Sequence, residues 1–234
     1  IGAQNILEAS IESKKISKVL ALSTDKAVSP INLYGATKLC SDKLFLSANA
    51  IKGDQEIKFS ILRYGNVMMS RGSVIPSFLN SKEKKFKVTT KDMTRFSLTL
   101  DQSIESAFYA LNNMQGGEII IPKAKSYKIL DLTKAIDPSK KVEIIGKRPG
   151  EKIDEILIPN TEADNTYENK HYYAVMSFNK KIKISGFKKV DKNFSYSSDK
   201  NEFFSVNEIR KLITDQNKIS EWFLIQLNLL IIMT

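Results

Sequence analysis

Two short, almost entirely apolar segments that alternate with helical patterns constrain the fold of this chain most. Residues 18–23 and 58–63 are apolar runs of strand length, whereas residues 5–14 and 33–50 repeat apolar side chains at helical spacing. Strands that are apolar on both faces and alternate with helices are typical of a parallel sheet covered on both sides. The pattern therefore predicts an α/β protein.

The pattern becomes more mixed after Gly72. Residues 101–114 are predicted to be a helix capped by Asp101, and strands are predicted near Phe96 and Ile119. We expect these two strands to return to the first sheet. The chain thus divides into a sheet region over 1–70, a smaller lobe over 71–215 and an atypical apolar tail over 216–234.

Composition excludes several classes of protein. The 234 residues include 42% hydrophobic side chains, enough for a substantial core, so disorder is not expected. Lys and Arg exceed Asp and Glu by 36 to 26, but the lysines are scattered and show no base-stacking aromatic pattern, which argues against nucleic-acid binding. The single cysteine, Cys40, is expected to be a packing residue, and with the single histidine, His171, it argues against a metal site.

The two ends of the chain carry further predictions. Ile1 lies inside an amphipathic segment without a basic and apolar leader, which favours the interior of a longer, cytoplasmic protein. The apolar run at 222–233 is shorter than the roughly 20 residues that span a bilayer, so no membrane span is predicted. A Gly-x-Gly-x-x-Gly turn, which would bind the phosphates of a dinucleotide, is not found in the sequence.

The strongest chemical signal is a Tyr and Lys pair that follows a strand. Tyr34 and Lys38 lie one helical turn apart, so both side chains project from the same face. A nearby ammonium favours the phenolate form of tyrosine and makes it a better base. Thr24, Asp25 and Lys26 follow the first predicted strand and add a hydroxyl, an acid and an amine, although Asp25 and Lys26 alone would also fit a solvated ion pair.

Together with their surroundings, these residues resemble the extended short-chain dehydrogenase/reductase superfamily and, within it, the nucleotide-sugar 4,6-dehydratases. The resemblance covers roughly residues 1–215 and implies a partial Rossmann-like parallel sheet, the carboxyl-terminal part of an NAD(P)-binding domain, followed by a smaller substrate-binding lobe. The shared motifs are Leu22-Ser-Thr-Asp-Lys-Ala27, Pro30-Ile-Asn-Leu-Tyr-Gly-Ala-Thr-Lys38, Leu62-Arg-Tyr-Gly-Asn-Val67, Ser70-Arg-Gly-Ser-Val74, Met93-Thr-Arg-Phe96 and Arg148-Pro-Gly-Glu-Lys152.

The resemblance implies a catalytic role for five residues. Tyr34 removes the proton of the sugar O4 while hydride leaves C4 for an NADP-type cofactor, and NAD remains an alternative. Lys26 then takes the C5 proton and Asp25 protonates the departing C6 hydroxyl, after which hydride returns to C6. Thr24 completes the group, and Lys38 holds the nicotinamide ribose.

Binding residues are also implied by the resemblance. Tyr64, together with Tyr34 and Lys38, borders the cofactor. Arginine forks match phosphate oxygens, and a carboxylate matches the paired hydroxyls of a ribose. The contacts to the UDP-sugar substrate are assigned to four residues from separate segments: Asn66, Arg95, Arg148 and Glu151.

Tyr34 stands where longer, membrane-bound relatives carry Met, which favours the soluble branch that acts on UDP-N-acetylglucosamine with inversion at C5. This branch opens the pathway to pseudaminic acid for flagellin glycosylation, and a homo-oligomer is expected for the full-length protein. Without the glycine-rich turn, we expect the chain by itself to be inactive. A UDP-N-acetylhexosamine 4-epimerase and a non-catalytic sugar-nucleotide-binding or assembly fragment are the alternatives, and the pair of Asp25 and Lys26 favours the dehydratase.

Overall fold

Strand β2 (Lys58–Tyr64) is buried on both of its faces. Ile61 packs into a hydrophobic cluster on one side of the sheet with Phe45 of the helix that follows β1. The next residue, Leu62, packs on the opposite side with Ala110. Because successive side chains of a strand point to opposite faces, a strand covered on both sides is largely apolar. The buried polar residues of β2, Ser60 and Arg63, are hydrogen-bonded to Glu118 and to the Leu157 carbonyl. The apolar run predicted from the sequence is therefore explained by burial on two faces.

The structure is a computed structural model that describes residues 1–177 and 186–216, and a central sheet runs through it. Its six strands follow the order β1-β2-β6-β11-β10-β12, and β1, β2 and β6 are parallel. The three remaining strands are antiparallel to their neighbours. The strands of this sheet are β1 (Lys18–Thr24), β2 (Lys58–Tyr64), β6 (Glu118–Pro122), β10 (Thr166–Glu168), β11 (Tyr172–Met176) and β12 (Lys188–Lys189).

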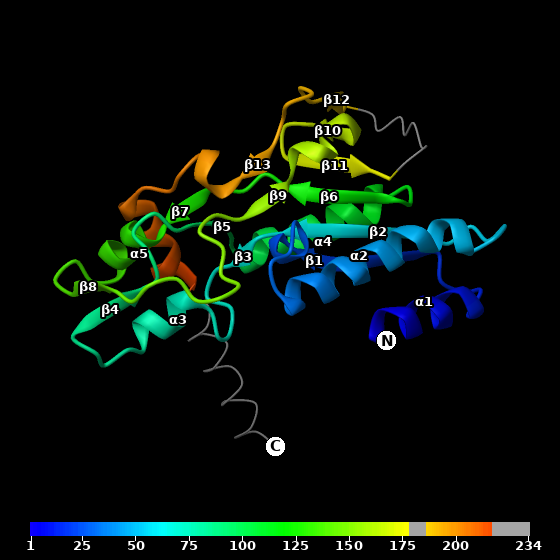
Figure 1. Ribbon diagram of the computed structural model, residues 1–234. Coiled ribbons are helices and arrows are strands. Elements are labelled where there is room, and N and C mark those ends of the chain that lie inside the picture. Colours follow the sequence, from blue (N-terminus) through cyan, green and yellow to red (C-terminus); the bar gives the residue numbers. More distant parts are fainter. Residues whose placement is uncertain (178–185, 217–234) are drawn as a thin grey trace, which may run out of the picture.

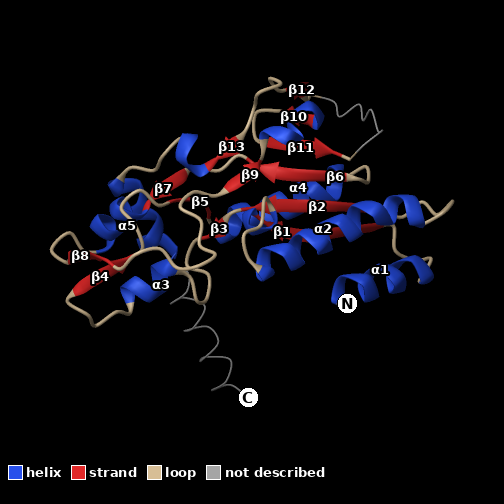
Figure 2. Cartoon of the chain, in the orientation of Figure 1, coloured by secondary structure: helices blue, strands red, loops and turns tan. Residues whose placement is uncertain are grey.

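Helices cover both faces of this sheet (Figures 1 and 2). Helices α1 (Gly2–Glu12) and α2 (Leu33–Ile51) lie on one face, and α4 (Leu100–Asn113) lies on the other. The α/β class with a partly parallel sheet is thus confirmed. Thr24 and Tyr64 are register partners, so β1 and β2 end side by side and deliver their following loops to the same edge.

A second hydrophobic cluster forms the core of the smaller lobe, which lies at the left of Figure 1. Helices α3 (Val74–Leu79) and α5 (Ile129–Ile136) contribute to it, and residues 206–216 are also helical. Outside the central sheet, the described strands form three small sheets: β3 (Asn66–Val67), β5 (Thr94–Leu98) and β7 (Ser126–Lys128); β4 (Lys85–Val88) and β8 (Lys141–Ile144); β9 (Ile156–Ile158) and β13 (Tyr196–Ser197). The pair β9 and β13 packs into the first hydrophobic cluster, on the central sheet.

Three expectations about these elements need correction. The strand at Ile119 joins the central sheet, but the one at Phe96 is β5, which pairs with β3 and β7 instead. Helix α4 is capped by Thr99, whose Oγ1 accepts a hydrogen bond from the Gln102 amide, because the helix begins before Asp101. Cys40 is exposed rather than packed.

Two expectations concern the chain's relation to a membrane and its carboxyl end. Across residues 1–177 and 186–216, none of the helices is both long enough and apolar enough to cross a bilayer. From residue 217 on, the predicted apolar tail falls outside the residues that the structure describes.

Candidate active site

The turn after β1 holds a buried acid against an amine. Thr24 ends the strand, accepts a hydrogen bond from the Lys26 amide at 3.4 Å and donates one from its Oγ1 to Asp25 Oδ1 at 2.8 Å. The Lys26 ammonium lies 2.9 Å from the same carboxylate oxygen. Asp25 is fully buried, and its second oxygen, Oδ2, has no hydrogen-bond partner among the residues that the structure describes. One oxygen of the acid is thus fixed by Thr24 and Lys26, and the other is not.

The beginning of α2 packs directly on this turn. Asn32 caps the helix by accepting a hydrogen bond from the Gly35 amide at 2.8 Å. A Cβ atom at Gly35 would overlap the carbonyl oxygen of Lys26, so only glycine allows this close approach. Tyr34 follows the cap and is 54% exposed. The helix therefore presents the Tyr34 side chain outward beside the Asp25 and Lys26 turn.

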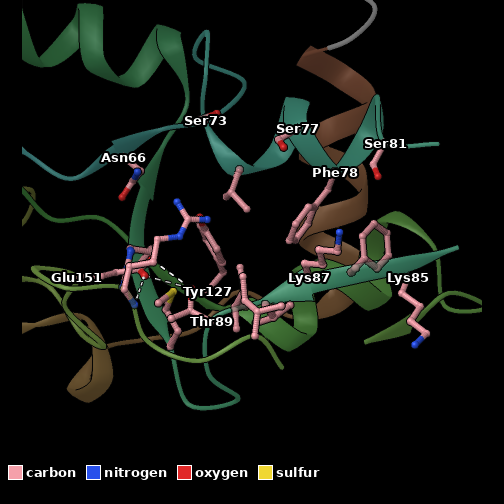
Figure 3. Close-up of a pocket in the computed structure, with 18 of the residues that line it drawn as sticks. Asn66, Ser73, Ser77, Phe78, Ser81, Lys85, Lys87, Thr89, Tyr127 and Glu151 are labelled. Carbon is pink, nitrogen blue, oxygen red and sulfur yellow. Dashed lines mark hydrogen bonds between the residues drawn. The ribbon is translucent and has the colours of Figure 1, made fainter. Parts of the chain in front are cut away.

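Two adjoining cavities lie between the sheet edge and the lobe. The larger, of about 490 Å³, extends into the lobe between α3 and β4, as Figure 3 shows from the labelled side chains of Ser77 and Lys87. The smaller, of about 370 Å³, reaches Lys26. The residues that line both cavities are Asn66, Arg95, Arg148 and Glu151. The four residues predicted to bind the substrate are therefore the ones that join the two cavities into one groove.

The Arg148-Pro-Gly150 turn is tied to both sides of this groove. The Asn32 side chain donates to the Gly150 carbonyl at 2.9 Å, which links the turn to the cap of α2. Glu151 accepts a hydrogen bond from Thr89 Oγ1 at 3.2 Å, which links it to the end of β4. Arg148 is exposed at the groove, so its guanidinium is accessible to an anion.

Arg95 uses most of its hydrogen-bond donors in contacts with backbone carbonyls of the protein. Its NH1 donates to the Thr94 carbonyl at 2.6 Å and to the Ile153 carbonyl at 2.7 Å, and its NH2 donates to the Lys152 carbonyl at 2.8 Å. The guanidinium therefore fixes the backbone that follows Glu151 as well as lining the groove. This support function was not predicted from the sequence.

Glu155 is the most informative residue that the sequence reasoning missed. It is 3% exposed, and its carboxylate lies 3.8 Å from Lys26, 3.9 Å from Arg95 and 3.8 Å from Lys152, measured between charged atoms. Burial, followed by the negative charge of Asp25, raises the pKa of Glu155. Burial lowers the pKa of Lys152. The sequence did offer one signal for Glu155: it lies three residues after Lys152, which ends the Arg148-Pro-Gly-Glu-Lys152 motif.

Further polar atoms at the groove have no hydrogen-bond partner within residues 1–177 and 186–216. Asn66 Oδ1 and Ser73 Oγ are buried without a hydrogen bond, and both residues line the larger cavity (Figure 3). The phenol of Tyr127 also lines it, and burial raises its pKa to about 12, so it stays protonated at neutral pH. Buried polar groups are normally satisfied, so these orphans are suited to a polar ligand.

Some of the predicted site residues line the groove and the others do not. Lys26 and the four substrate-binding candidates line the groove. Thr24 and Asp25 lie directly behind Lys26, whereas Tyr34, Lys38 and Tyr64 are placed at the carboxyl edge of the parallel strands, outside the lining of the two cavities. Thr89 and Tyr127 were missed, and nothing local to either residue in the sequence signals its place.

The partly parallel sheet with helices on both faces is the architecture that the resemblance to the extended short-chain dehydrogenase/reductase superfamily implies. Residues 1–177 match the family described as polysaccharide biosynthesis protein. The chain therefore belongs to this family.

Individual relatives refine the comparison. The UDP-N-acetylglucosamine 4,6-dehydratase (inverting) of Campylobacter jejuni is 44% identical over 91% of this chain and 67% of its own length. The UDP-glucose 4-epimerase of Rickettsia massiliae is 33% identical over 94% of this chain and 68% of its own. A crystal structure of Pen from Bacillus thuringiensis superimposes with a TM-score of 0.85 at 36% identity, covering 92% of this chain and 68% of that one.

Proposed function

We propose that this chain carries the catalytic and substrate-binding residues of a UDP-N-acetylglucosamine 4,6-dehydratase that inverts C5. The observation that carries this proposal is the buried Asp25 beside Lys26 at one end of a groove that also presents Arg148 and Glu151. The 44% identity to a relative of that activity supports it. The chemistry requires an acid and a base near one sugar, and Asp25 and Lys26 supply both.

A nicotinamide cofactor fits the residues at the carboxyl edge of the sheet. Tyr34 and Lys38 supply a phenol and an ammonium one turn apart on α2, and Tyr64 ends the neighbouring strand beside Thr24. These are the groups that would hold a nicotinamide ribose. When bound, the cofactor supplies a hydride acceptor for C4 and a hydride donor for C6. We propose NADP, with NAD as the alternative to be tested.

The proton transfers are assigned to three side chains. Tyr34 takes the O4 proton as C4 is oxidised, which makes the C5 proton acidic. Lys26, as the free amine, takes that C5 proton, and Asp25, in its acid form, gives its proton to the C6 oxygen. Water leaves, and the C5–C6 double bond forms from the electron pair of the C5–H bond. The final reduction at C6 and protonation at C5 give a 4-keto-6-deoxy sugar with no net redox change.

The groove has the shape to hold the nucleotide part of such a substrate. Arg148 is accessible for the diphosphate, and Glu151 is fixed by Thr89 where a ribose would lie. Beyond them the larger cavity is lined by polar side chains, such as Ser77 and Lys87, and by the aromatic rings of Phe78 and Tyr127 (Figure 3). A planar base stacks or packs well against such side chains.

An epimerase needs the Tyr34 and Lys38 pair but no acid and base for elimination. Asp25 is buried and is paired with Lys26, which lines the sugar end of the groove, so an acid and an amine stand together where the sugar would lie. These two residues favour the dehydratase over the 4-epimerase and over a binding module without catalysis.

The test is an assay with UDP-N-acetylglucosamine in D₂O, with NADP and NAD in parallel arms. It uses this chain and a chain extended with the residues of the Campylobacter relative that the match leaves uncovered. From the extended chain we expect a 4-keto-6-deoxy product with deuterium at C5 and inverted C5 configuration, and from this chain alone we expect no product. A product epimerised at C4 would favour the epimerase, and UDP-sugar binding without turnover in both chains would favour a binding module.

Several finer expectations stay predictions of this proposal. They are the cytoplasmic location, the homo-oligomer, and the place of the reaction in the pathway to pseudaminic acid and flagellin glycosylation. Ultracentrifugation of the extended chain tests the oligomer directly.

A further inference from the structure

Glu155 is a buried carboxylate to which the proposed proton transfers assign no role. Its backbone is fixed on both sides, because its amide donates to Ser198 Oγ at 2.9 Å and its carbonyl accepts from the Ser198 amide at 2.8 Å. Ser198 Oγ in turn lies 2.6 Å from Thr94 Oγ1. The position of Glu155 is therefore set by three segments and not by the groove alone.

Four charged groups act on Glu155, and the segment with Ser198 that also packs against it adds none. Lys26 and Asp25 approach from the turn after β1, Arg95 from β5, and Lys152 from its own segment. All three cations lie at 3.8–3.9 Å, beyond hydrogen-bond distance, and Glu155 Oε2 has no hydrogen-bond partner. Glu155 therefore interacts with these cations by charge, while each cation makes its hydrogen bonds elsewhere: Lys26 to Asp25, Lys152 to the Val28 carbonyl and Arg95 to backbone carbonyls.

We propose that Glu155 is a positioning residue for Lys26, holding its side chain at the sugar end of the groove and balancing the charge that Lys26 gains on accepting a proton. The role in turnover rests on the proposed dehydratase function. Lys26 lies between two carboxylates, at 2.9 Å from Asp25 and 3.8 Å from Glu155. When Asp25 is in its acid form, Glu155 is the carboxylate that remains within 4 Å to balance an ammonium at Lys26.

The experiment measures the reactivity of the Lys26 amine in this chain, which needs no turnover. Wild type and Glu155→Gln are labelled with limiting acetic anhydride at pH 7.5, and the modification of Lys26 is quantified by mass spectrometry relative to the exposed Lys43. Only the neutral amine reacts. Glu155→Gln removes a negative charge near Lys26 and also leaves the positive charges of Arg95 and Lys152 without that counter-charge. Both changes disfavour the ammonium form of Lys26.

We expect the ratio of Lys26 to Lys43 labelling to rise roughly tenfold in Glu155→Gln, corresponding to about 1.4 kcal/mol of lost electrostatic stabilisation. Glu168→Gln is the matched control. Glu168 pairs with Lys123 at 2.7 Å, so labelling of Lys123 should rise there while that of Lys26 stays unchanged.

An unchanged Lys26 ratio in folded Glu155→Gln overturns the inference. If that variant does not fold, Glu155→Asp decides, because it keeps the charge but withdraws it from the three cations; a rise in the ratio supports the inference, and no rise overturns it. The dehydratase assay of the wild type judges the proposed function separately. Absence of product there leaves the labelling result for Glu155 and Lys26 intact.

Discussion

Two buried charged clusters lie near the same edge of the sheet, and they are built differently. In the first, Arg63 donates to the Leu157 carbonyl at 3.0 Å and to Glu162 at 2.9 Å, while Asp42 accepts from Ser23 at 2.7 Å. We call these residues the Arg63 cluster. In the second, the Asp25 cluster of Asp25, Lys26, Arg95, Lys152 and Glu155, the three cations surround Glu155 at 3.8–3.9 Å and two carboxylate oxygens are unpartnered.

The difference separates a structural cluster from a candidate catalytic one. Short hydrogen bonds in the Arg63 cluster join strands β1 and β2 to α2 and to the segment around β9, and none of its three charged members lines the groove. The Asp25 cluster reaches the groove through four of its five members, Lys26, Arg95, Lys152 and Glu155. Both clusters contain buried polar atoms without a hydrogen bond among the described residues, Arg63 Nε in the first and Asp25 Oδ2 and Glu155 Oε2 in the second. Access to the groove is therefore what distinguishes them, because charged groups that serve a reaction have to reach a ligand.

Replacing the acid of the Asp25 cluster should have the largest effect. We expect Asp25→Asn to lower turnover of UDP-N-acetylglucosamine by about 10²- to 10⁴-fold, the usual contribution of a general acid, with UDP binding and folding retained. The measurements are steady-state kinetics, made on whichever of this chain and the extended chain shows activity, and calorimetric titration with UDP. Asp131→Asn, which changes an exposed pair with Lys134, is the control. Full activity in Asp25→Asn would contradict the assignment.

Breaking the Arg63 cluster should affect stability instead. Arg63→Met leaves the buried Asp42 without its cation and Leu157 without a donor. We expect a loss of about 3–5 kcal/mol in the free energy of unfolding, the cost of removing one partner of a buried pair. Urea denaturation of Arg63→Met and of the exposed control Arg71→Met measures it. If the two variants were equally stable, the cluster would have no structural role.

Arg148 should contribute to substrate affinity and little to stability. It is exposed at the groove, and a charged hydrogen bond to phosphate is worth about 1.5–3 kcal/mol, so Arg148→Ala should weaken UDP binding by roughly tenfold or more. Titration calorimetry with UDP checks this, with Arg210→Ala as a control away from the groove. Equal UDP affinities of wild type and Arg148→Ala would remove Arg148 from the site.

The smallest effect concerns the pH dependence of stability. Burial raises the pKa of Glu155. At pH values between the ordinary carboxyl pKa and this raised pKa, the folded protein keeps a proton on Glu155 that the unfolded chain has released. Stability therefore falls as pH increases through this window, and Glu155→Gln should make the fall shallower. Burial also raises the pKa of Asp42, so part of the slope remains. Thermal unfolding from pH 4 to 7 measures the slope, and an identical slope in both proteins would contradict the prediction.

The predictable part of the site is local in sequence. Tyr34 and Lys38 share a helix, and Thr24, Asp25 and Lys26 are consecutive after a strand, so their spacing alone brings them together. The α/β class could be predicted from the apolar runs because their length and spacing are also local in sequence. The capping residue of α4 was predicted wrongly because two polar residues, Thr99 and Asp101, compete near one helix start, and the helix boundary decides between them.

By itself, the sequence determined the α/β class, the first two parallel strands and the helix with Tyr34, because these depend on spacing along a few turns or one strand. The roles of Tyr34, Asp25 and Lys26 in catalysis stay predictions. The tertiary structure alone decided that Glu155 faces Lys26, that Thr89 holds Glu151, and that Arg95 supports the backbone at Lys152 and Ile153. These contacts join segments about 60 to 130 residues apart. No local propensity encodes such pairings, since they arise only when the lobe packs against the sheet edge and buries both sides together.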